Sequence, residues 1–507
     1  MTAPGLGNQK GCPALGEIMR KLLLFQIVFL LASCTAGPDY VRPPVETPEA
    51  YRERPEATSE AKGWKQAEPK AEIVRGKWWE IFNDPELNRL EDQVNISNQN
   101  ILGAEARFRQ ARALAQAARA GYFPTVAAGA SYTRSKGSAN SVSGKGGGIG
   151  STASSYTLPV DVNWDLDLWG KVKRTVEAAG ADAESIAAEL ESVRLGSQAE
   201  LAQDYFELRS LDAQKQILDK TVSSYEDFLQ LTRNRYAGGV SSSIDVLQAE
   251  TQLKTTQALS IDIGVQRSRL EHAIALIIGK PASAVIIKPA ASPLAGIPVI
   301  PAGLPSELLE RRPDIAAAER LMAAANAGIG IAGAAFFPTV SLSSAFGLGS
   351  SHLSDWFSWP SRFWSLGGAV TEAVFEGGLR RAQTEAARAS YEATVASYRQ
   401  TVLAAFQEVE DNLSALRILG EEAGVQDEAL NASGKALEAT MNQYKAGTVS
   451  YLNVITAQTA KLNNERAAAD ILGRRAVSSV LLIKALGGGW RAAELNGTLD
   501  QAGPPRH

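Results

Sequence analysis

Residues 160–168 read Val-Asp-Val-Asn-Trp-Asp-Leu-Asp-Leu, so apolar and polar side chains alternate without exception. Successive side chains of a β-strand point to opposite faces of a sheet, and a period of two therefore predicts a strand with one apolar and one polar face. The stretches 126–132 and 340–348 alternate in the same way. The aspartates of residues 160–168 lie along a line, whereas the oxygens around a calcium ion converge on one point, so we interpret them as a solvated face.

An internal duplication surrounds these strands. Phe-Pro-Thr-Val stands at 123–126 and again at 337–340, and a Tyr-x-x-Gly motif ends a helical stretch in each half of the chain. Each copy offers two strands, which predicts a strand hairpin at about 124–168 and another at about 338–375. The first hairpin contains the Gly/Ser-rich tract 137–155, which predicts a flexible loop. The chain is therefore interpreted as one unit repeated, with four strands in all.

Beyond each strand pair the sequence becomes helical. No proline occurs between Pro159 and Pro281 or between Pro360 and Pro504, and good helix formers dominate both stretches. We predict helical hairpins at about 177–278 and about 385–486. A helical arm of about 60 residues would span roughly 90 Å, so these helices must pack side by side as a bundle or coiled coil. Glycines break each hairpin, and we assign the turns to Gly238, Gly239 and Gly447.

The N-terminus has the features of an export signal. Met19-Arg20-Lys21 is basic, residues 22–31 are apolar, and Leu31-Ala32-Ser33-Cys34 follows directly. The apolar run is shorter than the roughly 20 residues that a membrane-spanning helix needs, which favours a signal peptide with Met19 as a candidate start. Leu-Ala-Ser-Cys resembles the bacterial lipobox and implies lipidation of Cys34, palmitate included; the alternative is a buried cysteine inside a signal anchor.

The chain is thus divided into five segments. Residues 1–33 are the signal peptide and 34–76 a lipidated, proline-rich linker. The two copies of the repeat occupy 77–290 and 291–490. Residues 491–507 form a C-terminal tail.

The composition argues against catalysis and nucleic-acid binding. The net charge is −4, with 21% charged and 45% hydrophobic residues, which gives no strong field for a nucleic acid. Three histidines and two cysteines cannot assemble a metal site at these spacings. Gly144-Lys145-Gly146 lacks the flanking residues of a phosphate-binding loop. We therefore expect no enzymatic activity, no cofactor and no metal.

Four amphipathic strands are too few to close a barrel, because small barrels need about eight. An open sheet edge in lipid would leave backbone groups unpaired, at several kcal/mol each. Self-association is the direct remedy, and three chains would supply twelve strands. The apolar faces would then meet lipid, the polar faces would line water, and the paired helices would form a second cylinder.

Several motifs together resemble one family. They are the lipobox, Gly-Pro-Asp-Tyr-Val-Arg-Pro-Pro at 37–44, the doubled Phe-Pro-Thr-Val, Trp-Asp-Leu-Asp-Leu-Trp-Gly at 164–170 and the doubled Tyr-x-x-Gly turn. This set resembles the NodT-type lipoprotein branch of the TolC-like outer-membrane factors, over Cys34 to about Leu486. The resemblance implies an α+β membrane channel: a homotrimeric twelve-stranded β-barrel continued by a long periplasmic α-barrel with a mixed equatorial region.

The same resemblance implies a function. The channel would be the exit duct of a tripartite efflux system in the outer membrane of a Gram-negative bacterium, anchored by lipid and lying largely in the periplasm. Its partners would be a periplasmic adaptor protein and an inner-membrane pump of the RND type. Small molecules such as drugs, toxic compounds or metals would pass through it passively.

The resemblance also places a gate at the helix turns. Tyr444 matches the family tyrosine that bonds an aspartate on the neighbouring hairpin, and Asp245 matches that aspartate. Asn453 and Thr456 match the acidic residues of the family's aperture but carry no charge, and Val449 replaces the arginine after the turn glycine. An acidic entrance ring and an ion-pair latch are therefore not expected.

Alternatives remain at the gate and for the whole chain. Tyr236 is the counterpart of Tyr444 in the first copy and is assigned to the gate with it. Asp245 could instead only cap the helix that follows the first turn, a role that serines 241–243 could also fill. The alternative function is a lipid-anchored coiled-coil spacer between envelope layers, which would conduct no ions across a bilayer.

Overall fold

The computed structural model describes residues 36–53, 76–136, 152–290, 297–301, 303 and 305–490 of the 507-residue chain. The predicted signal peptide, Cys34, Gly144-Lys145-Gly146 and the C-terminal tail lie outside these residues. The chain forms two compact units: residues 1–42, 110–183 and 320–396 make up the first, and 43–109, 184–319 and 397–507 the second. Each unit takes segments from both sequence copies.

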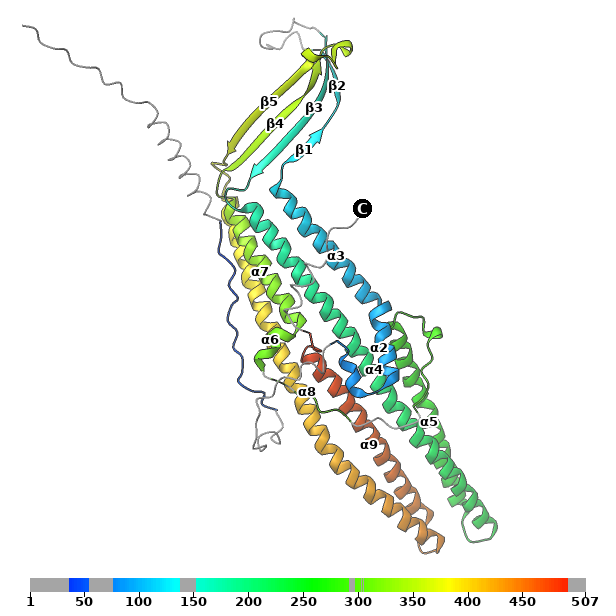
Figure 1. Ribbon diagram of the computed structural model, residues 1–507. Coiled ribbons are helices and arrows are strands. Elements are labelled where there is room, and N and C mark those ends of the chain that lie inside the picture. Colours follow the sequence, from blue (N-terminus) through cyan, green and yellow to red (C-terminus); the bar gives the residue numbers. More distant parts are fainter. Residues whose placement is uncertain are drawn as a thin grey trace, which may run out of the picture. The chain divides into compact units, whose positions relative to one another are not determined.

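The first unit contains one antiparallel sheet (Figure 1). Its strands are β1 (Thr125–Ala128), β2 (Ser131–Lys136), β3 (Thr152–Leu166), β4 (Thr339–Ser350) and β5 (Arg362–Thr371). The order is β1-β3-β4-β5, and β2 also pairs with β3. β1 and β2 pair with successive parts of β3, so they are one strand that Gly129 and Ala130 interrupt. The sheet thus has the four expected strands, the first of which is divided into β1 and β2.

The predicted loop at 137–155 is too long at its C-terminal end. β3 begins at Thr152, and Ser154 and Ser155 pair with Arg134 and Thr133 of β2. Composition indicated a loop, but cross-strand contacts determine the structure here. The rings of Tyr132 and Tyr156 lie 4.7 Å apart between β2 and β3. Residues 137–151 lie outside the described residues.

The register separates the two faces that the alternation predicts. Val160, Phe346 and Trp364 are direct partners on one face, and Asp161, Ala345 and Ser365 on the other. Phe346 is 50% exposed and Trp364 is 80% exposed in the single chain. Large apolar side chains therefore cover one face of the sheet, and the described residues of the single chain leave them exposed.

Long helices make up most of the remaining chain. The helices longer than one turn are α2 (Pro85–Ser97), α3 (Gln99–Arg119), α4 (Lys171–Ala237), α5 (Ser243–Ile277), α7 (Pro313–Ala334), α8 (Leu379–Lys445) and α9 (Tyr451–Ala485). α4 and α8 each have 67 residues, and α5 and α9 each have 35. α4 and α8 begin ahead of the predicted residues 177 and 385. In α4 this early start has a visible cause, because Asp167 accepts hydrogen bonds from the backbone amides of Val172 and Lys173.

In the part of the chain that the structure describes, no helix is both long and apolar enough to cross a bilayer.

The second unit is organised around a core between α2, α4, α5 and α9. Trp78, Trp79, Leu87 and Leu90 are buried there against Tyr205 and its neighbours. Asp84 caps α2 and also accepts a 2.6 Å hydrogen bond from the Tyr205 hydroxyl. Burying aromatic side chains of this size is a main source of stability, so this core holds the C-terminal ends of α5 and α9 against α2 and α4.

Candidate functional site at the helix turns

Two turns of the same geometry end the long helices (Figure 1). In the first, the amide of Val240 donates to the carbonyl of Arg235 at 2.8 Å and that of Gly239 to Tyr236 at 3.0 Å. The amides of Thr448 and Gly447 make the equivalent bonds in the second turn. This pattern is the Schellman motif, in which the residue after the helix takes a left-handed conformation. Gly239 and Gly447 occupy that position, with φ of +76° and +78°.

Of the three turn glycines assigned from sequence, Gly238 has a different role. Its φ is not positive, and an added Cβ would come no closer than 3.5 Å to the Asn234 carbonyl oxygen. Ala446 stands at the same position of the second turn. Gly239 and Gly447 are therefore the two glycines that the turns require.

Asp245 belongs to the cap of α5. The Ser242 side chain accepts from the Asp245 amide at 3.2 Å, and the Asp245 carboxylate accepts from the Ser242 amide at 3.0 Å, which completes a capping box. The Ser241 hydroxyl donates to the same carboxylate at 2.7 Å. Partial burial would raise the pKa of Asp245, but these hydrogen bonds and the charge of Arg235 outweigh it, so the pKa lies below its ordinary value.

An aromatic cluster joins the two hairpins close to their turns. We call it the tip cluster; its buried residues are Tyr225, Phe228, Leu229, Ala249, Leu253, Tyr444, Tyr451 and Val454. Phe228 of α4 stacks on Tyr451 of α9, with ring centres 5.3 Å apart and planes 12° apart. Phe228 also contacts Tyr444 of α8 at 5.6 Å. Aromatic pairs of this kind contribute about 0.5–1.5 kcal/mol beyond their burial, so the tip cluster holds the hairpins together.

Arg235 adds a polar link between the same hairpins. Its guanidinium carbon lies 4.9 Å from the centre of the Tyr444 ring, a cation–π distance. Its Nη1 donates to the carbonyl of Lys445 at the end of α8, at 3.2 Å. A cation beside the last carbonyls of a helix also complements the helix dipole.

Within the described residues of the single chain, the Tyr444 hydroxyl and the Asp245 carboxylate make no hydrogen bond with each other, so the latch between neighbouring hairpins stays a prediction. The Tyr444 hydroxyl is buried and finds no hydrogen-bond partner among the residues that the structure describes. The Asp245 carboxylate is occupied by Ser241 and Ser242, which are its neighbours in sequence and need no second hairpin to reach it. Asp245 therefore has the capping role in this chain, and Tyr444 contributes the ring contacts of the tip cluster.

The other assigned residues are at the surface. Tyr236 is 52% exposed, although its counterpart Tyr444 is 4% exposed. Asn453 and Thr456 are exposed on α9, and the Thr456 hydroxyl donates to the carbonyl of Leu452. Val449 packs on the tip cluster. The structure thus brings Tyr444 into the tip cluster and leaves Tyr236, Asn453 and Thr456 outside it.

Sequence reasoning missed Arg235, Phe228 and Tyr451. The family resemblance places an arginine after the turn glycine of the second copy, whereas Arg235 precedes the turn glycine of the first copy. Tyr451 starts α9 directly after the second turn, and an aromatic residue at that place could have indicated a buried partner. The burial of Phe228 could not be predicted from its place in α4, because its ring is covered by Tyr451 of α9, which is distant in sequence.

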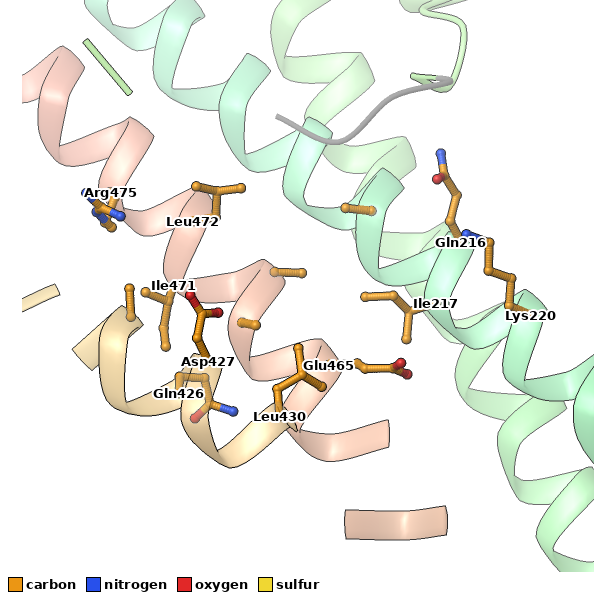
Figure 2. A pocket seen from close by; sticks show the side chains of 14 residues that line it. Gln216, Ile217, Lys220, Gln426, Asp427, Leu430, Glu465, Ile471, Leu472 and Arg475 are labelled. Carbon is orange, nitrogen blue, oxygen red and sulfur yellow. The ribbon is translucent and has the colours of Figure 1, made fainter. Parts of the chain in front are cut away.

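A separate cavity of about 510 Å³ lies farther from the turns. Its lining side chains come from α4 on one side and from α8 and α9 on the other (Figure 2). Ile217, Leu430 and Leu472 form its apolar part, and charged residues of both signs surround them. None of the assigned gate residues lines it.

Comparisons with known proteins identify relatives of the whole chain. The family model described as "Outer membrane efflux protein" matches residues 90–280 and 304–488. The probable efflux pump outer membrane protein TtgC of Pseudomonas putida is 31% identical over 476 residues, covering 93% of this chain and 96% of TtgC. The outer membrane protein OprJ of Pseudomonas aeruginosa is 31% identical, covering 92% and 95%. Among solved structures, the outer-membrane channel OprN matches with a TM-score of 0.82 and 32% identity, covering 90% of this chain and 100% of OprN.

Proposed function

The chain belongs to the outer membrane efflux protein family, and we propose that it is the exit duct of a tripartite efflux system, gated at its helix turns and anchored by lipid at Cys34. It works as an outer-membrane channel of a Gram-negative bacterium, with a periplasmic adaptor and an inner-membrane RND pump as partners. Small molecules pass through it passively, because the pump supplies the energy.

The observation that carries this function is the sheet. Its order leaves β1 with β2 at one edge and β5 at the other, and among the described residues no strand pairs with either outer side. One face presents large exposed apolar side chains. Within lipid such edges are satisfied only by closure, and three copies close a twelve-stranded barrel with an apolar outer face and a polar lumen.

The tip cluster supports the proposed gate. Helices that line a duct can close it only if their ends are held together, and the tip cluster joins both hairpins of one chain by aromatic contacts. Arg235 adds a bond from α4 to the end of α8. Opening would separate these contacts, so their combined strength sets the population of the closed state. Tyr236, Asn453 and Thr456, exposed near the turns, are proposed to line the entrance.

Lipidation of Cys34 is proposed from the lipobox alone. Two or more acyl chains give stable anchoring where one gives marginal binding. We infer no catalytic role, because the family members are channels and the assigned residues are explained by packing at Tyr444, capping at Asp245 and the proposed lining of the entrance. The spacer alternative does not account for a sheet with one exposed apolar face.

Dye accumulation in cells tests the proposed function. Cells that lack the chain should retain a fluorescent efflux substrate, and expression of the wild-type chain should restore its export. Crosslinking in the intact envelope should recover an adaptor and an inner-membrane pump with it. Equal dye retention with and without the chain, across a panel of cationic and neutral dyes, would contradict an export function.

A further inference from the structure

The residues that follow Cys34 are held in a socket of the first unit. Ala36 donates its amide to the carbonyl of Trp169 at 3.1 Å. The side chain of Asn326, itself buried, donates to the carbonyl of Pro38 at 3.1 Å. Residues 36–39 are therefore fixed at both ends, although the sequence predicts a free proline-rich linker there.

Arg174 forms the floor of this socket. Its side chain is 2% exposed and lies in the first turn of α4. It donates to the carbonyls of Ala36 and Gly37 at 3.2 and 3.3 Å and to the Asp39 carboxylate at 2.8 Å. Glu177 supplies the fourth acceptor, at 2.8 Å. Three of the four acceptors of a buried guanidinium thus come from residues 36–39, and a buried cation that loses its acceptors is strongly destabilising.

Two glycines allow the backbone to lie this close to α7. Gly37 has φ of +88°, and a Cβ on it would lie 2.4 Å from the Cα of Gly330. A Cβ on Gly330 would lie 2.8 Å from Cγ of Arg174 and 2.9 Å from the carbonyl oxygen of Ala36. Neither position has room for a side chain. Glycine at both positions therefore lets the backbone of residues 36–37 pack directly on the backbone of α7 and on Arg174.

The socket lies where the sheet meets the helices. Trp169 lies shortly after the end of β3 at Leu166. Its ring stacks on Phe337 at 4.8 Å, and its ring N–H donates to the carbonyl of Pro338, just before β4. Phe123, before β1, is 70% exposed, and Phe337 is 43% exposed. Exposed aromatic residues at the ends of membrane strands mark the level of the lipid head groups.

We propose that this socket is the docking site of the acylated N-terminus. Cys34 is two residues from Ala36, so its Cα is at most about 7 Å away. The acyl chains then enter the membrane at the aromatic end of the sheet, and Arg174 sets the place where they leave the protein. The lipid anchor is thereby part of the barrel's contact with the membrane. This inference rests on the proposed lipidation of Cys34, but the docking of residues 36–39 can be tested without it.

A disulfide tests the docking directly. A Cβ on Gly333 would lie 3.9 Å from the Cβ of Ala36, within the range of disulfide geometry. The double variant Ala36→Cys/Gly333→Cys, expressed as the full chain and isolated in outer membranes, should form this bond on brief oxidation. Its formation is read from alkylation of free thiols followed by peptide mass spectrometry.

Two backgrounds test the part played by the arginine. In an Arg174→Met background crosslinking should slow by at least about tenfold, because all three donations to residues 36–39 are lost and one charge-assisted hydrogen bond alone is worth about that factor. Lys173→Met, on the adjacent exposed position of α4, should leave the rate unchanged. Removal of a buried arginine can impair folding, so Asp39→Asn provides a milder variant, because the Asp39 side chain is 88% exposed. Glu46→Gln, at another exposed position of the same segment, is its control.

The outcomes separate the two proposals. Slower crosslinking in Arg174→Met or Asp39→Asn, with unchanged rates in both controls, supports the socket. Free thiols at positions 36 and 333 in a chain whose mass shows the acyl groups would overturn the socket and leave the lipid anchor standing. A mature mass without acyl groups would overturn the lipid anchor, and with it the role of the socket as its docking site.

Discussion

Tyr236 and Tyr444 stand at equivalent positions of the two copies, yet one is 52% exposed and the other 4%. Their neighbours differ, because Arg235 precedes the first tyrosine and Gln443 the second. Arg235 reaches across to the ring of Tyr444, and within the described residues no cation of the second copy makes the equivalent contact with the ring of Tyr236. The duplication could therefore predict both turns but not which tyrosine is buried, since burial depends on the side chains that differ between copies.

The unbonded hydroxyl of Tyr444 leads to a prediction. A buried polar group without a partner costs about 1–3 kcal/mol, so Tyr444→Phe should keep the channel closed and raise its melting temperature. Tyr444→Ala removes the ring contacts with Phe228 and Tyr451 and should lower stability by about 3 kcal/mol and raise resting conductance. Thermal unfolding and bilayer recordings check both. Equal conductance increases in the two variants would support the hydroxyl latch.

Glu91 predicts a pH dependence in the second unit. It is fully buried on α2, and in the described part of the chain both carboxylate oxygens lack a partner. Burial raises its pKa well above the ordinary value. The folded state therefore binds a proton that the unfolded state releases above its own pKa near 4.5. As the pH rises from that value toward the raised pKa, the free energy of unfolding should fall by about 1.4 kcal/mol per pH unit.

Glu91→Gln removes this dependence. The variant should be more stable than the wild type at neutral pH and should show a flatter profile of melting temperature against pH. Glu86→Gln, on the same helix but partly exposed and paired with Arg89, is the control. Identical profiles for the wild type and Glu91→Gln would show that Glu91 is not titrating in this range.

At the level of elements, the periodicities predicted the strand at 160–168, the repeated hairpins and the positions of the turns. The interruption at Gly129 and Ala130 was not predicted, because single small residues within an alternating run do not reveal a break in pairing. The early start of α4 was not predicted either. Asp167 fits the alternating pattern of the strand, but in the structure its carboxylate caps α4. The pattern therefore favoured the strand and hid the start of the helix.

The Schellman turns give a prediction that separates neighbouring glycines. Gly239→Ala and Gly447→Ala place a Cβ in the left-handed region, which costs about 1–2 kcal/mol. Gly238→Ala should be neutral or slightly stabilising, since the backbone there is not left-handed and alanine stands at the same place in the second turn. Chemical unfolding of the three variants compares them. A loss with Gly238→Ala equal to that with Gly239→Ala would contradict the assigned turn geometry.

At the level of the whole molecule, three chains bring three copies of every surface residue around one axis. Asn453 is exposed on α9 close to the second turn and carries no charge. Asn453→Asp should create a ring of three carboxylates and strengthen block by divalent and trivalent cations added on the periplasmic side. Asn431→Asp adds the same charge on α8, farther from the turn, and should change the block little. Equal block in the wild type and Asn453→Asp would place this residue away from the entrance.

The central claim is that three chains form a conducting duct closed at the helix turns, and single-channel recording in planar bilayers tests it most directly. Purified wild-type protein should insert as trimers and give discrete conductance steps, low at rest and higher in Tyr444→Ala, with Tyr444→Phe resembling the wild type. Trimers that insert but give no steps, in the wild type and in Tyr444→Ala alike, would contradict the duct and favour a structural spacer.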